Sequence, residues 1–298
     1  MQKGQALLNQ KGQALLIVLL SMSVILTIVL SILSRSVTDI AVTTREEEAL
    51  RAFSAAEAGV EQALLEGGFQ VLTGDFEENS SSFRAEVSGF AEGTSEFAYP
   101  IEIASGDTAT VWFVAHDDNG SLICDATHPC YTGTQMTVCW GNVGTPADSV
   151  TTPALEVSVL YAATPGDYST VRVARQTFDA NTLRRASNSF SAANLGCTAE
   201  AQSYAFGATV DFAGLGIPAV SFGTQNGLQV AKLRMIYNTG VSHLLGVDAG
   251  NILPAQGAKI DSVGNAGEST RRVEVYKLFA DLPPIFDSVL FTPSSISK

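Results

Sequence analysis

This 298-residue sequence has no recognisable catalytic motif, and its first half is poor in basic side chains after the apolar run. No GxSxG, HExxH or phosphate-loop pattern occurs, and the three histidines, His116, His128 and His243, lie in different segments. Over Ala52–Asp125, fourteen carboxylates stand against one base, Arg84. Such a surface repels phosphate backbones, so we expect no nucleic-acid partner. We also expect that the protein is not an enzyme and binds no cofactor or metal; a tethered hydrolase stays open only because Asp and Glu are plentiful.

The sequence has no charge, proline or glycine between Ala14 and Leu33, a run of twenty residues. A helix of this length spans a hydrocarbon core of roughly 30 Å. A cleaved secretory signal has a shorter apolar region, about 7–15 residues, whereas this run continues into Ser34-Arg35-Ser36. A buried core helix keeps a polar stripe, but here only four hydroxyl groups interrupt the run, and they can bond to carbonyls of their own helix. We therefore predict a single-pass membrane anchor.

Charges that flank the run favour a cytoplasmic N-terminus, because Lys3 and Lys11 precede it, although Arg35 and Arg45 follow it. We expect the rest of the chain to lie outside the cytoplasm. An ordinary anchor with no further role is compatible with these observations.

The helix is expected to continue beyond the membrane, because no Pro or Gly follows the run until Gly59. Leu50, Phe53, Val60 and Leu64 recur at helical spacings and predict one apolar stripe. Gly67-Gly68 can provide the left-handed cap that ends it. A helix over residues 13–66 would be about 80 Å long at 1.5 Å per residue. On its solvated side, Glu47 and Glu48 both lie within reach of Arg51.

Beyond the helix, short β-rich segments separated by Gly, Pro, Asn and Asp predict a head over residues 67–298. We predict an α+β fold: a long N-terminal helix, transmembrane and then an amphipathic stalk, carrying a mostly antiparallel β-rich head. One continuous domain is favoured over two β units split near Gly141–Pro153. Asn238-Thr239-Gly240 predicts a hairpin turn. The predicted strands are Phe83–Phe90, Phe97–Ala104, Thr110–Ala115, Gln135–Trp140, Ala154–Tyr161, Thr170–Phe178, Ser203–Phe212, Leu228–Tyr237, Ser242–Val247, Ala258–Val263, Arg272–Phe279 and Ile285–Phe291.

All four cysteines, Cys124, Cys130, Cys139 and Cys197, follow the anchor. An even number in a segment outside the cytoplasm favours disulfides. Three pairings are possible, and we favour Cys124 with Cys130 and Cys139 with Cys197, because near neighbours close with little loss of chain entropy. A zinc site from Cys124, His128, Cys130 and Cys139 is the alternative, but its spacing matches no familiar motif.

Two further motifs have simple explanations. Asp117-Asp118-Asn119-Gly120 could begin a calcium loop, but Ala115 stands where the first acidic ligand would be, and a β-turn with Asn-Gly at its tip explains the same residues. Arg184-Arg185-Ala186-Ser187 has the form of a kinase site but is expected outside the cytoplasm, away from ATP, so we interpret it as a chance match.

Residues 11–66, about a fifth of the chain, resemble the minor type IV pilins of the PilX type, which are relatives of the pseudopilins of type II secretion. The resemblance rests on Lys11-Gly12 before an apolar helix, a charged continuation, and the run Phe53-Ser-Ala-Ala-Glu57-Ala-Gly59-Val-Glu61-Gln-Ala63. It implies that residues 1–12 are a leader peptide that a prepilin peptidase removes after Gly12. Gln13 would be the new, usually N-methylated, first residue. Cleavage after Gly4 is not favoured, because it would leave Lys11 within the apolar segment.

The resemblance departs from the common pilin pattern at the fifth mature position, where most pilins have Glu and this chain has Ile17. That Glu is thought to neutralise the terminal amine of a neighbouring subunit within an apolar bundle. A subunit with Ile17 suits a position where no partner amine needs pairing, such as a filament tip. The alternative is that this lineage dispenses with the pair.

The resemblance therefore implies a non-enzymatic assembly subunit, held in the cytoplasmic membrane by its helix with the head outside, and afterwards part of a cell-surface filament. Its expected partners are other pilin subunits, the prepilin peptidase and the membrane. A stand-alone membrane-tethered adhesin or binding protein is the alternative from another class.

Overall fold

The structure, a computed structural model, describes residues 5–117 and 119–281, with side chains described from Gln13 onward. By its internal contacts the chain divides into two compact units. The first unit contains residues 1–65, 71–85 and 261–273, and the second contains residues 66–70, 86–260 and 274–298. The predicted strand Ile285–Phe291 lies outside the described residues, as does the beginning of the predicted leader.

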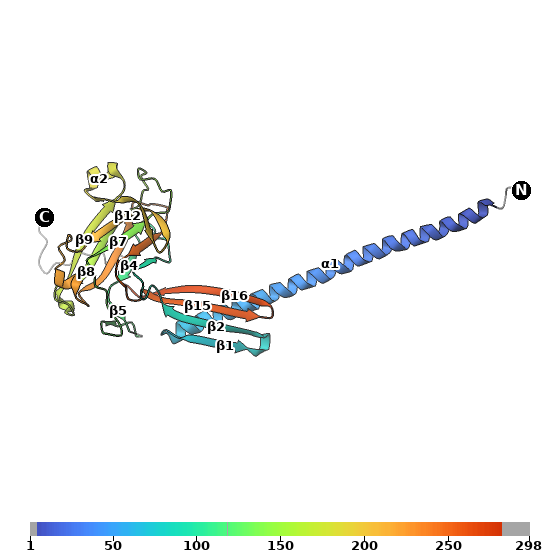
Figure 1. The fold of residues 1–298 in the computed structure, drawn as a ribbon, viewed down its shortest axis with the longest axis horizontal. Helices are drawn as coiled ribbons and strands as arrows, with labels where there is room; N and C mark the ends of the chain where they lie inside the picture. The colour runs from blue at the N-terminus through green and yellow to red at the C-terminus, as the bar shows by residue number, and fades with distance from the viewer. Residues whose placement is uncertain (1–4, 118, 282–298) are drawn as a thin grey trace. The chain divides into compact units, whose positions relative to one another are not determined.

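The first unit is built on helix α1 (Gln5–Glu66), which runs unbroken for 62 residues (Figure 1). The helix ends where the chain reaches Gly67 and Gly68, whose φ angles are +67° and +72°. Side-chain-bearing residues rarely adopt this left-handed conformation, so the two glycines stop the helix at little cost. The predicted continuous helix and its end are confirmed.

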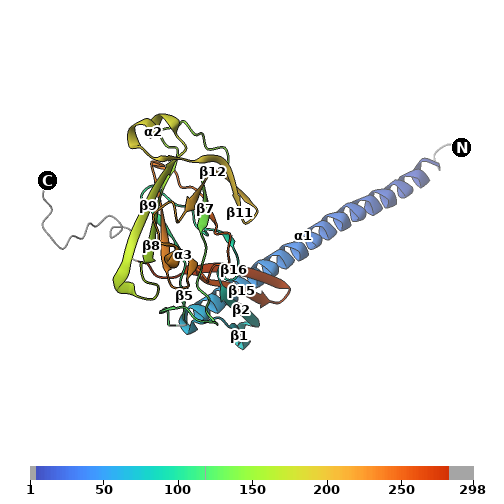
Figure 2. The same cartoon turned by 60° about the vertical axis from the view of Figure 1, so that its left-hand side comes forward.

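A four-stranded sheet in the order β1-β2-β15-β16 accompanies the C-terminal part of α1 (Figures 1 and 2). Its first two strands follow the helix directly, and the other two come from near the C-terminal end of the described chain. The strands are β1 (Val71–Phe76), β2 (Ser81–Gly89), β15 (Gly257–Ala266) and β16 (Ser269–Leu278), with a short 3₁₀ helix, η1 (Glu77–Asn79), between β1 and β2.

The prediction of which residues form the apolar stripe on the stalk is wrong. The structure leaves Leu50, Phe53 and Leu64 exposed, and of the four predicted positions only Val60 is buried. The buried face of α1 instead consists of small side chains at helical spacing, namely Ala52, Ala55, Ala56 and Ala63. The reason is that strand β15 approaches the helix at a glycine, so the contact has room only for alanine and glycine.

The second unit contains two five-stranded sheets. The order in one is β10-β9-β8-β13-β4, and in the other it is β11-β12-β7-β14-β3. The strands of the first are β4 (Thr108–Trp112), β8 (Ala154–Ala162), β9 (Val171–Asp179), β10 (Ser191–Ala192) and β13 (Leu228–Ile236). Those of the second are β3 (Glu96–Ala98), β7 (Gln135–Trp140), β11 (Asn194–Ala199), β12 (Gln202–Asp211) and β14 (Leu245–Asp248).

Shorter elements complete this unit. A small hairpin joins β5 (Ala115–His116) to β6 (Leu122–Ile123). Helices α2 (Thr182–Asn188) and α3 (Ala219–Gly223) and the 3₁₀ helix η2 (Tyr168–Thr170) connect the strands. Strand β10 pairs with β9 in parallel, and the other neighbouring strands described in both sheets pair antiparallel. The predicted α+β class, a long helix with a β-rich head, is confirmed.

One apolar core joins the two large sheets. Val157 and Leu233 from one sheet share a buried cluster with Trp140, Phe206 and Val247 from the other. Alternation along the strands explains this arrangement: in β8 the side chains at 155, 157 and 159 are buried, whereas those at 156, 158 and 160 are partly exposed. A sandwich of this kind needs only period-two patterns in its strands.

Strand prediction was best where alternation was clear. Gln135–Trp140 coincides with β7, and Ala154–Tyr161 and Ser203–Phe212 differ from β8 and β12 by one residue at one or both ends. Strands β1 and β11 were not predicted. The residues of β11 are mostly exposed, so the strand does not show a clear alternation of apolar and polar residues. Of the predicted strand Phe97–Ala104 only the first two residues are in β3, with an isolated bridge at Ile103.

The hairpin predicted at Asn238-Thr239-Gly240 is wrong, because the strands on either side belong to different sheets. A turn does occur there, with the N–H of Val241 donating to the carbonyl of Asn238 and Gly240 at φ +77°. The buried Asn238 amide donates to the carbonyls of Ile103 and Val241, which holds the chain as it passes from one sheet to the other.

Candidate functional site

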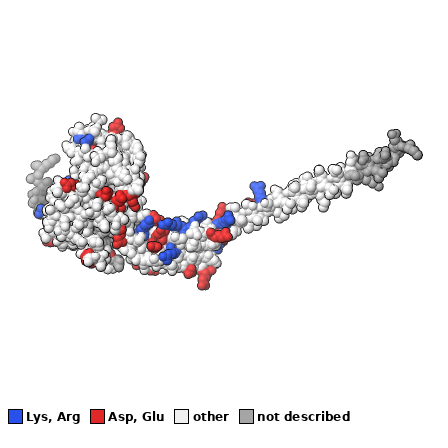
Figure 3. Space-filling view, viewed as in Figure 1, with Lys and Arg blue, Asp and Glu red and all other residues white. Residues whose placement is uncertain are grey.

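The apolar run of α1 has no covering partner in the described chain. From Leu15 to Leu33 its large side chains are all exposed, Ile17 by 64%. The hydroxyl groups of Ser21, Ser23 and Thr27 donate to helix carbonyls three residues earlier, at 2.8–2.9 Å, as expected. Because these bonds satisfy the polar groups internally, the run presents an almost wholly apolar surface. Figure 3 shows no charged side chain along it.

Among the described helices, α1 is the one that is long and apolar enough to cross a membrane, with a mean hydropathy of 2.9 over its most apolar window. The residues predicted for processing, Gly12 and Gln13, lie within the helix. Ile17 lies one turn further on. Cleavage at Gly12 and the meaning of Ile17 stay predictions.

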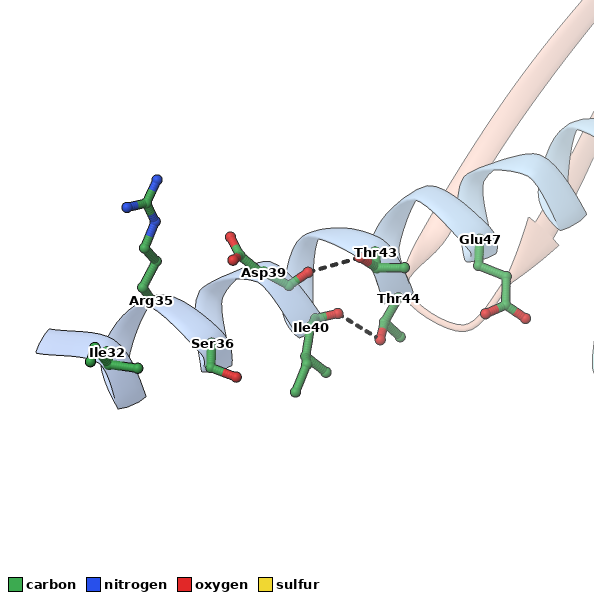
Figure 4. Close-up of a pocket in the computed structure, with 8 residues that line it drawn as sticks. All are labelled: Ile32, Arg35, Ser36, Asp39, Ile40, Thr43, Thr44 and Glu47. Carbon is green, nitrogen blue, oxygen red and sulfur yellow. Dashed lines mark hydrogen bonds between the residues drawn. The ribbon is translucent and has the colours of Figure 1, made fainter. Parts of the chain in front are cut away.

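Beyond the run, α1 changes from an apolar to a mixed surface. A shallow depression along the helix is lined by Ile32, Arg35, Ser36, Asp39, Ile40, Thr43, Thr44 and Glu47 (Figure 4). Thr43 and Thr44 donate to the carbonyls of Asp39 and Ile40, at 2.9 and 3.0 Å. Since one helix supplies every lining residue, the depression cannot enclose a small molecule. It marks the change in surface character.

The last third of α1 packs closely on the sheet because glycines occupy the points of contact. A Cβ built on Gly264 of β15 would lie 2.0 Å from the carbonyl oxygen of Ala52 and 2.5 Å from the backbone nitrogen of Ala56. On the helix, a Cβ on Gly59 would lie 2.4 Å from Ser262 Oγ and 2.6 Å from the Phe83 ring. Helix and sheet therefore meet almost backbone to backbone.

The polar contacts that flank this helix–sheet interface differ from those expected. Arg51 Nη1 donates to the carbonyl of Asn79 at 2.9 Å, and its Nε lies 4.0 Å from Glu47. Glu48, which was expected to reach Arg51, instead accepts from the N–H of Glu268 at 3.2 Å, in the turn between β15 and β16. The ionic side chains thus tie the helix to the sheet as well as to itself.

Two disulfides lie in the second unit, Cys124–Cys130 and Cys139–Cys197, the pairing favoured from the sequence. Cys139 lies in β7 opposite Gly207 of β12 and Gly246 of β14. A Cβ on Gly207 would come within 2.5 Å of Cys197 Sγ. The glycine therefore makes the space in which the second disulfide crosses β12. Bonded sulfurs cannot act as zinc thiolates, so the zinc alternative is excluded for these four cysteines.

Each of the three histidines contacts different residues. His116 stacks on Phe279, His128 Nδ1 lies 3.1 Å from Asp125, and the buried His243 accepts from the N–H of Asn142. Burial lowers the pKa of both His116 and His243, opposed by nearby carboxylates.

Acidic side chains serve as local structural acceptors. Asp117 accepts from the N–H groups of Asn119 and Ser121, and these bonds support the interpretation of this segment as a β-turn. Hydrogen bonds from Thr127 and His128 lower the pKa of Asp125 to about 2. Among the described residues no group of three or more His, Cys, Asp or Glu could hold a metal ion.

A buried ion pair that no sequence motif predicts connects helix α2 to β9. Asp179 is fully buried and accepts from Arg184 Nε and Nη2, at 2.7 and 2.8 Å. Arg184 also donates to the carbonyls of Val150 and Thr152, and its guanidinium lies 4.0 Å from the centre of the Tyr237 ring. The motif that resembled a kinase site is therefore a structural element.

Changing Asp179 to Asn should lower the free energy of unfolding by about 2 kcal/mol, because hydrogen bonds to a charged partner are lost. Both tryptophans, Trp112 and Trp140, lie in the second unit, so denaturant titration followed by tryptophan fluorescence measures the effect. Asp148→Asn, at an exposed position, is the matched control and should be neutral.

The same ion pair predicts a pH dependence. Burial of Asp179 raises its pKa, but hydrogen bonds from Arg184, Asn181 and Asn188 outweigh this, and the pKa lies below its ordinary value of 3.8. The contribution to stability is therefore present above about pH 4 and is lost as the pH falls through the folded-state pKa. In Asp179→Asn this part of the acid sensitivity should be missing; an unchanged acid profile would contradict the assignment.

No family model, curated protein or solved structure matches the chain in comparisons with known proteins.

Proposed function

We propose that the chain is a minor pilin or pseudopilin, a structural subunit of a type IV pilus or a related secretion filament. The observation that carries the proposal is the form of α1: one unbroken helix of 62 residues, apolar and uncovered in its first part and seated on a sheet in its last part. A simple anchor needs only about 20 apolar residues and no rigid continuation. A continuous rod suits a helix that packs with others in a filament core.

The surface of the chain supports the same proposal. The exposed run offers an apolar surface of the kind that a bundle of helices buries, and the acidic, disulfide-bonded β-rich unit would face outward. Ile17 fits a subunit at the end of a filament, because it provides no carboxylate for a neighbouring amine. Before assembly, the run would hold the protein in the cytoplasmic membrane.

Mass spectrometry of the mature N-terminus tests the proposal. We expect the mature chain to begin at Gln13, with a methyl group on its amine. Gly12→Trp should abolish maturation, because the peptidase would no longer find glycine before the cleaved bond. The sequence QKGQALL occurs twice, at Gln2–Leu8 and at Gln10–Leu16. Gly4→Trp, in the first copy, is therefore the matched control and should mature normally.

An N-terminus that begins at Met1, or normal maturation of Gly12→Trp, would overturn the proposal or its cleavage site. Fractionation separates the alternative of a stand-alone adhesin. A filament subunit should be recovered with sheared surface filaments, whereas an adhesin should stay with the membranes.

A further inference from the structure

Strand β11 lies over the outer face of its own sheet as well as beside β12. It pairs with β12 at the edge of the sheet, yet it also contacts β7, β14 and β3. In a flat sheet, β11 and β7 would be two strand spacings apart, roughly 10 Å. The Cα atoms of Cys139 in β7 and Cys197 in β11 are instead 5.4 Å apart. The hairpin of β11 and β12 therefore folds back over the sheet.

The surface beneath β11 consists of small side chains. Strand pairing aligns them in one row across four strands, namely Gly207 of β12, Cys139 of β7, Gly246 of β14 and Ala98 of β3. The residues on either side of them along the strands belong to the core, so this row lies on the outer face. A Cβ on Gly246 would come within 2.5 Å of the hydroxyl oxygen of Tyr204. The small residues thus make room for the folded-back hairpin.

Residues 194–204, which we call the arm, pack separately from the main core. Within the arm, Ala199 and Tyr204 are buried in a small cluster with Cys139, and none of the three belongs to the main core. Two residues further along β12, Phe206 is part of the main core. Of the six residues of β11, Ala199 is the one that is buried. The arm can therefore detach without opening the two-sheet sandwich.

Two links hold the arm on the sheet. One is the disulfide between Cys139 and Cys197. The other lies at the tip of the arm, where Glu200 Oε2 accepts from the N–H of Ala98 at 2.6 Å. The N–H of Glu200 in turn donates to Glu96 Oε2 at 2.8 Å. Because Glu96 and Ala98 belong to β3, the far edge strand, the second link spans the whole sheet.

We propose that the arm is a redox-controlled flap, which lifts from the sheet when Cys139–Cys197 is reduced while the sandwich stays folded. The remaining link is weak, because Glu96 and Glu200 are exposed and water competes for their hydrogen bonds. The flap is a property of the second unit and does not rest on the proposed filament function.

The reduction is a thiol–disulfide exchange. Cys197 is partly exposed, so the thiolate of a dithiol can attack its sulfur. The bond to Cys139 breaks, and Cys139 leaves as a thiolate and takes up a proton. The second sulfur of the dithiol then closes a cyclic disulfide and releases Cys197 as a thiol. Two hydrogens thus pass from the dithiol to the protein.

The buried hydroxyl group of Tyr204 favours lifting once the disulfide is open. Tyr204 is 3% exposed, and its hydroxyl group has no hydrogen-bond partner in the described part of the chain. A buried polar group without a partner costs free energy, which is recovered when the group reaches water. A two-stranded hairpin without support is also at best marginally stable, so the raised arm should lose protection along its length.

Alkylation of the detergent-solubilised full-length protein tests the flap. After reduction with dithiothreitol, iodoacetamide should label Cys139 within about three-fold of the rate at Cys197, because lifting exposes both thiols. With the arm in place Cys139 is fully buried. In hydrogen–deuterium exchange, amides over 195–204 should exchange at least about ten-fold faster after reduction, while those of β8 and β13 should change by less than about two-fold. The proposal is overturned if Cys139 resists alkylation in the reduced protein.

Cysteine variants separate lifting from general loss of structure. Cys139→Ala combined with Cys197→Ala should show the fast exchange over 195–204 without any reductant. Cys124→Ala combined with Cys130→Ala removes the other disulfide of the same unit and should leave the arm protected. Equal loss of protection in the arm and in β8 and β13 of the first double variant would overturn the proposal, because the arm would then not move separately.

A glutamate variant tests which link is decisive. Glu200→Ala with the disulfide intact should speed exchange over 195–204 by less than about three-fold, because the disulfide still holds the arm. Glu102→Ala, at an exposed position outside the arm, is the matched control and should have no effect there. If Glu200→Ala alone freed the arm, the disulfide would not control it and the proposal would be wrong.

Discussion

Changing Cys139 and Cys197 together to alanine should lower the free energy of unfolding of the second unit by about 4 kcal/mol, as expected when a cross-link over 58 residues is removed from the unfolded chain. The bond also joins β7 to β11 across the intervening strand β12, so its loss frees an exposed edge strand. Denaturant titration followed by the fluorescence of Trp112 and Trp140 measures the change.

The second disulfide provides the matched control. Cys124 and Cys130 are separated by only six residues, so removal of this bond should cost about 2 kcal/mol by the same entropy relation. If both double variants lost the same stability, loop closure would not be the main contribution of the longer bond. Alkylation without reductant should label none of the four cysteines in the native protein.

Gly264→Val should detach α1 from the sheet of the first unit. The added Cβ would meet the backbone of Ala52 and Ala56 at 2.0 and 2.5 Å, and neither the helix backbone nor the β15 backbone can move aside as a side chain can. Overpacking usually costs about 1–3 kcal/mol, and a clash between two backbones belongs at or above the top of that range. Limited proteolysis should then cut α1 near residues 45–63.

Two measurements make this prediction specific. Tryptophan fluorescence reports only the second unit, so the free energy of unfolding that it measures should stay within about 0.5 kcal/mol of that of the parent protein. Gly223→Ala is the control substitution, because a Cβ at that position meets no atom within 4 Å. Resistance of α1 to proteolysis in Gly264→Val would show that the helix does not depend on this contact.

Local sequence signals predicted α1 well, because a missing breaker and a pair of glycines act within a few residues. The same signals failed for the buried face of the helix. The helical spacing of Leu50 and Phe53 predicts that these large side chains face the core, but the distance between helix and sheet is set by Gly264, more than two hundred residues away. Only the folded chain shows that alanines line the contact.

Long-range pairing explains the other differences. Asn238–Gly240 has the residues of a turn, but which sheet the next strand joins depends on partners far along the chain. The Asp179–Arg184 pair could have been suspected from Asn181, which caps α2 by accepting from the N–H groups of Leu183 and Arg184. Its burial, however, follows from tertiary packing. Disulfide pairing by nearness agreed with the structure. Cys124 and Cys130 are six residues apart in one loop, and strands β7 and β11 place Cys139 and Cys197 on either side of β12.

If the uncovered run of α1 lies in a bilayer, as the proposed function requires, its surface also limits the route by which the protein can leave. Transfer of its fifteen large apolar side chains into water would cost on the order of 30 kcal/mol, at about 2 kcal/mol each. A freely dissolved intermediate would therefore never be populated. In the proposed assembly, lipid would then be exchanged directly for the apolar surface of another subunit. Extraction and the arrival of that subunit would be one event, and the supply of subunits would set the rate of departure.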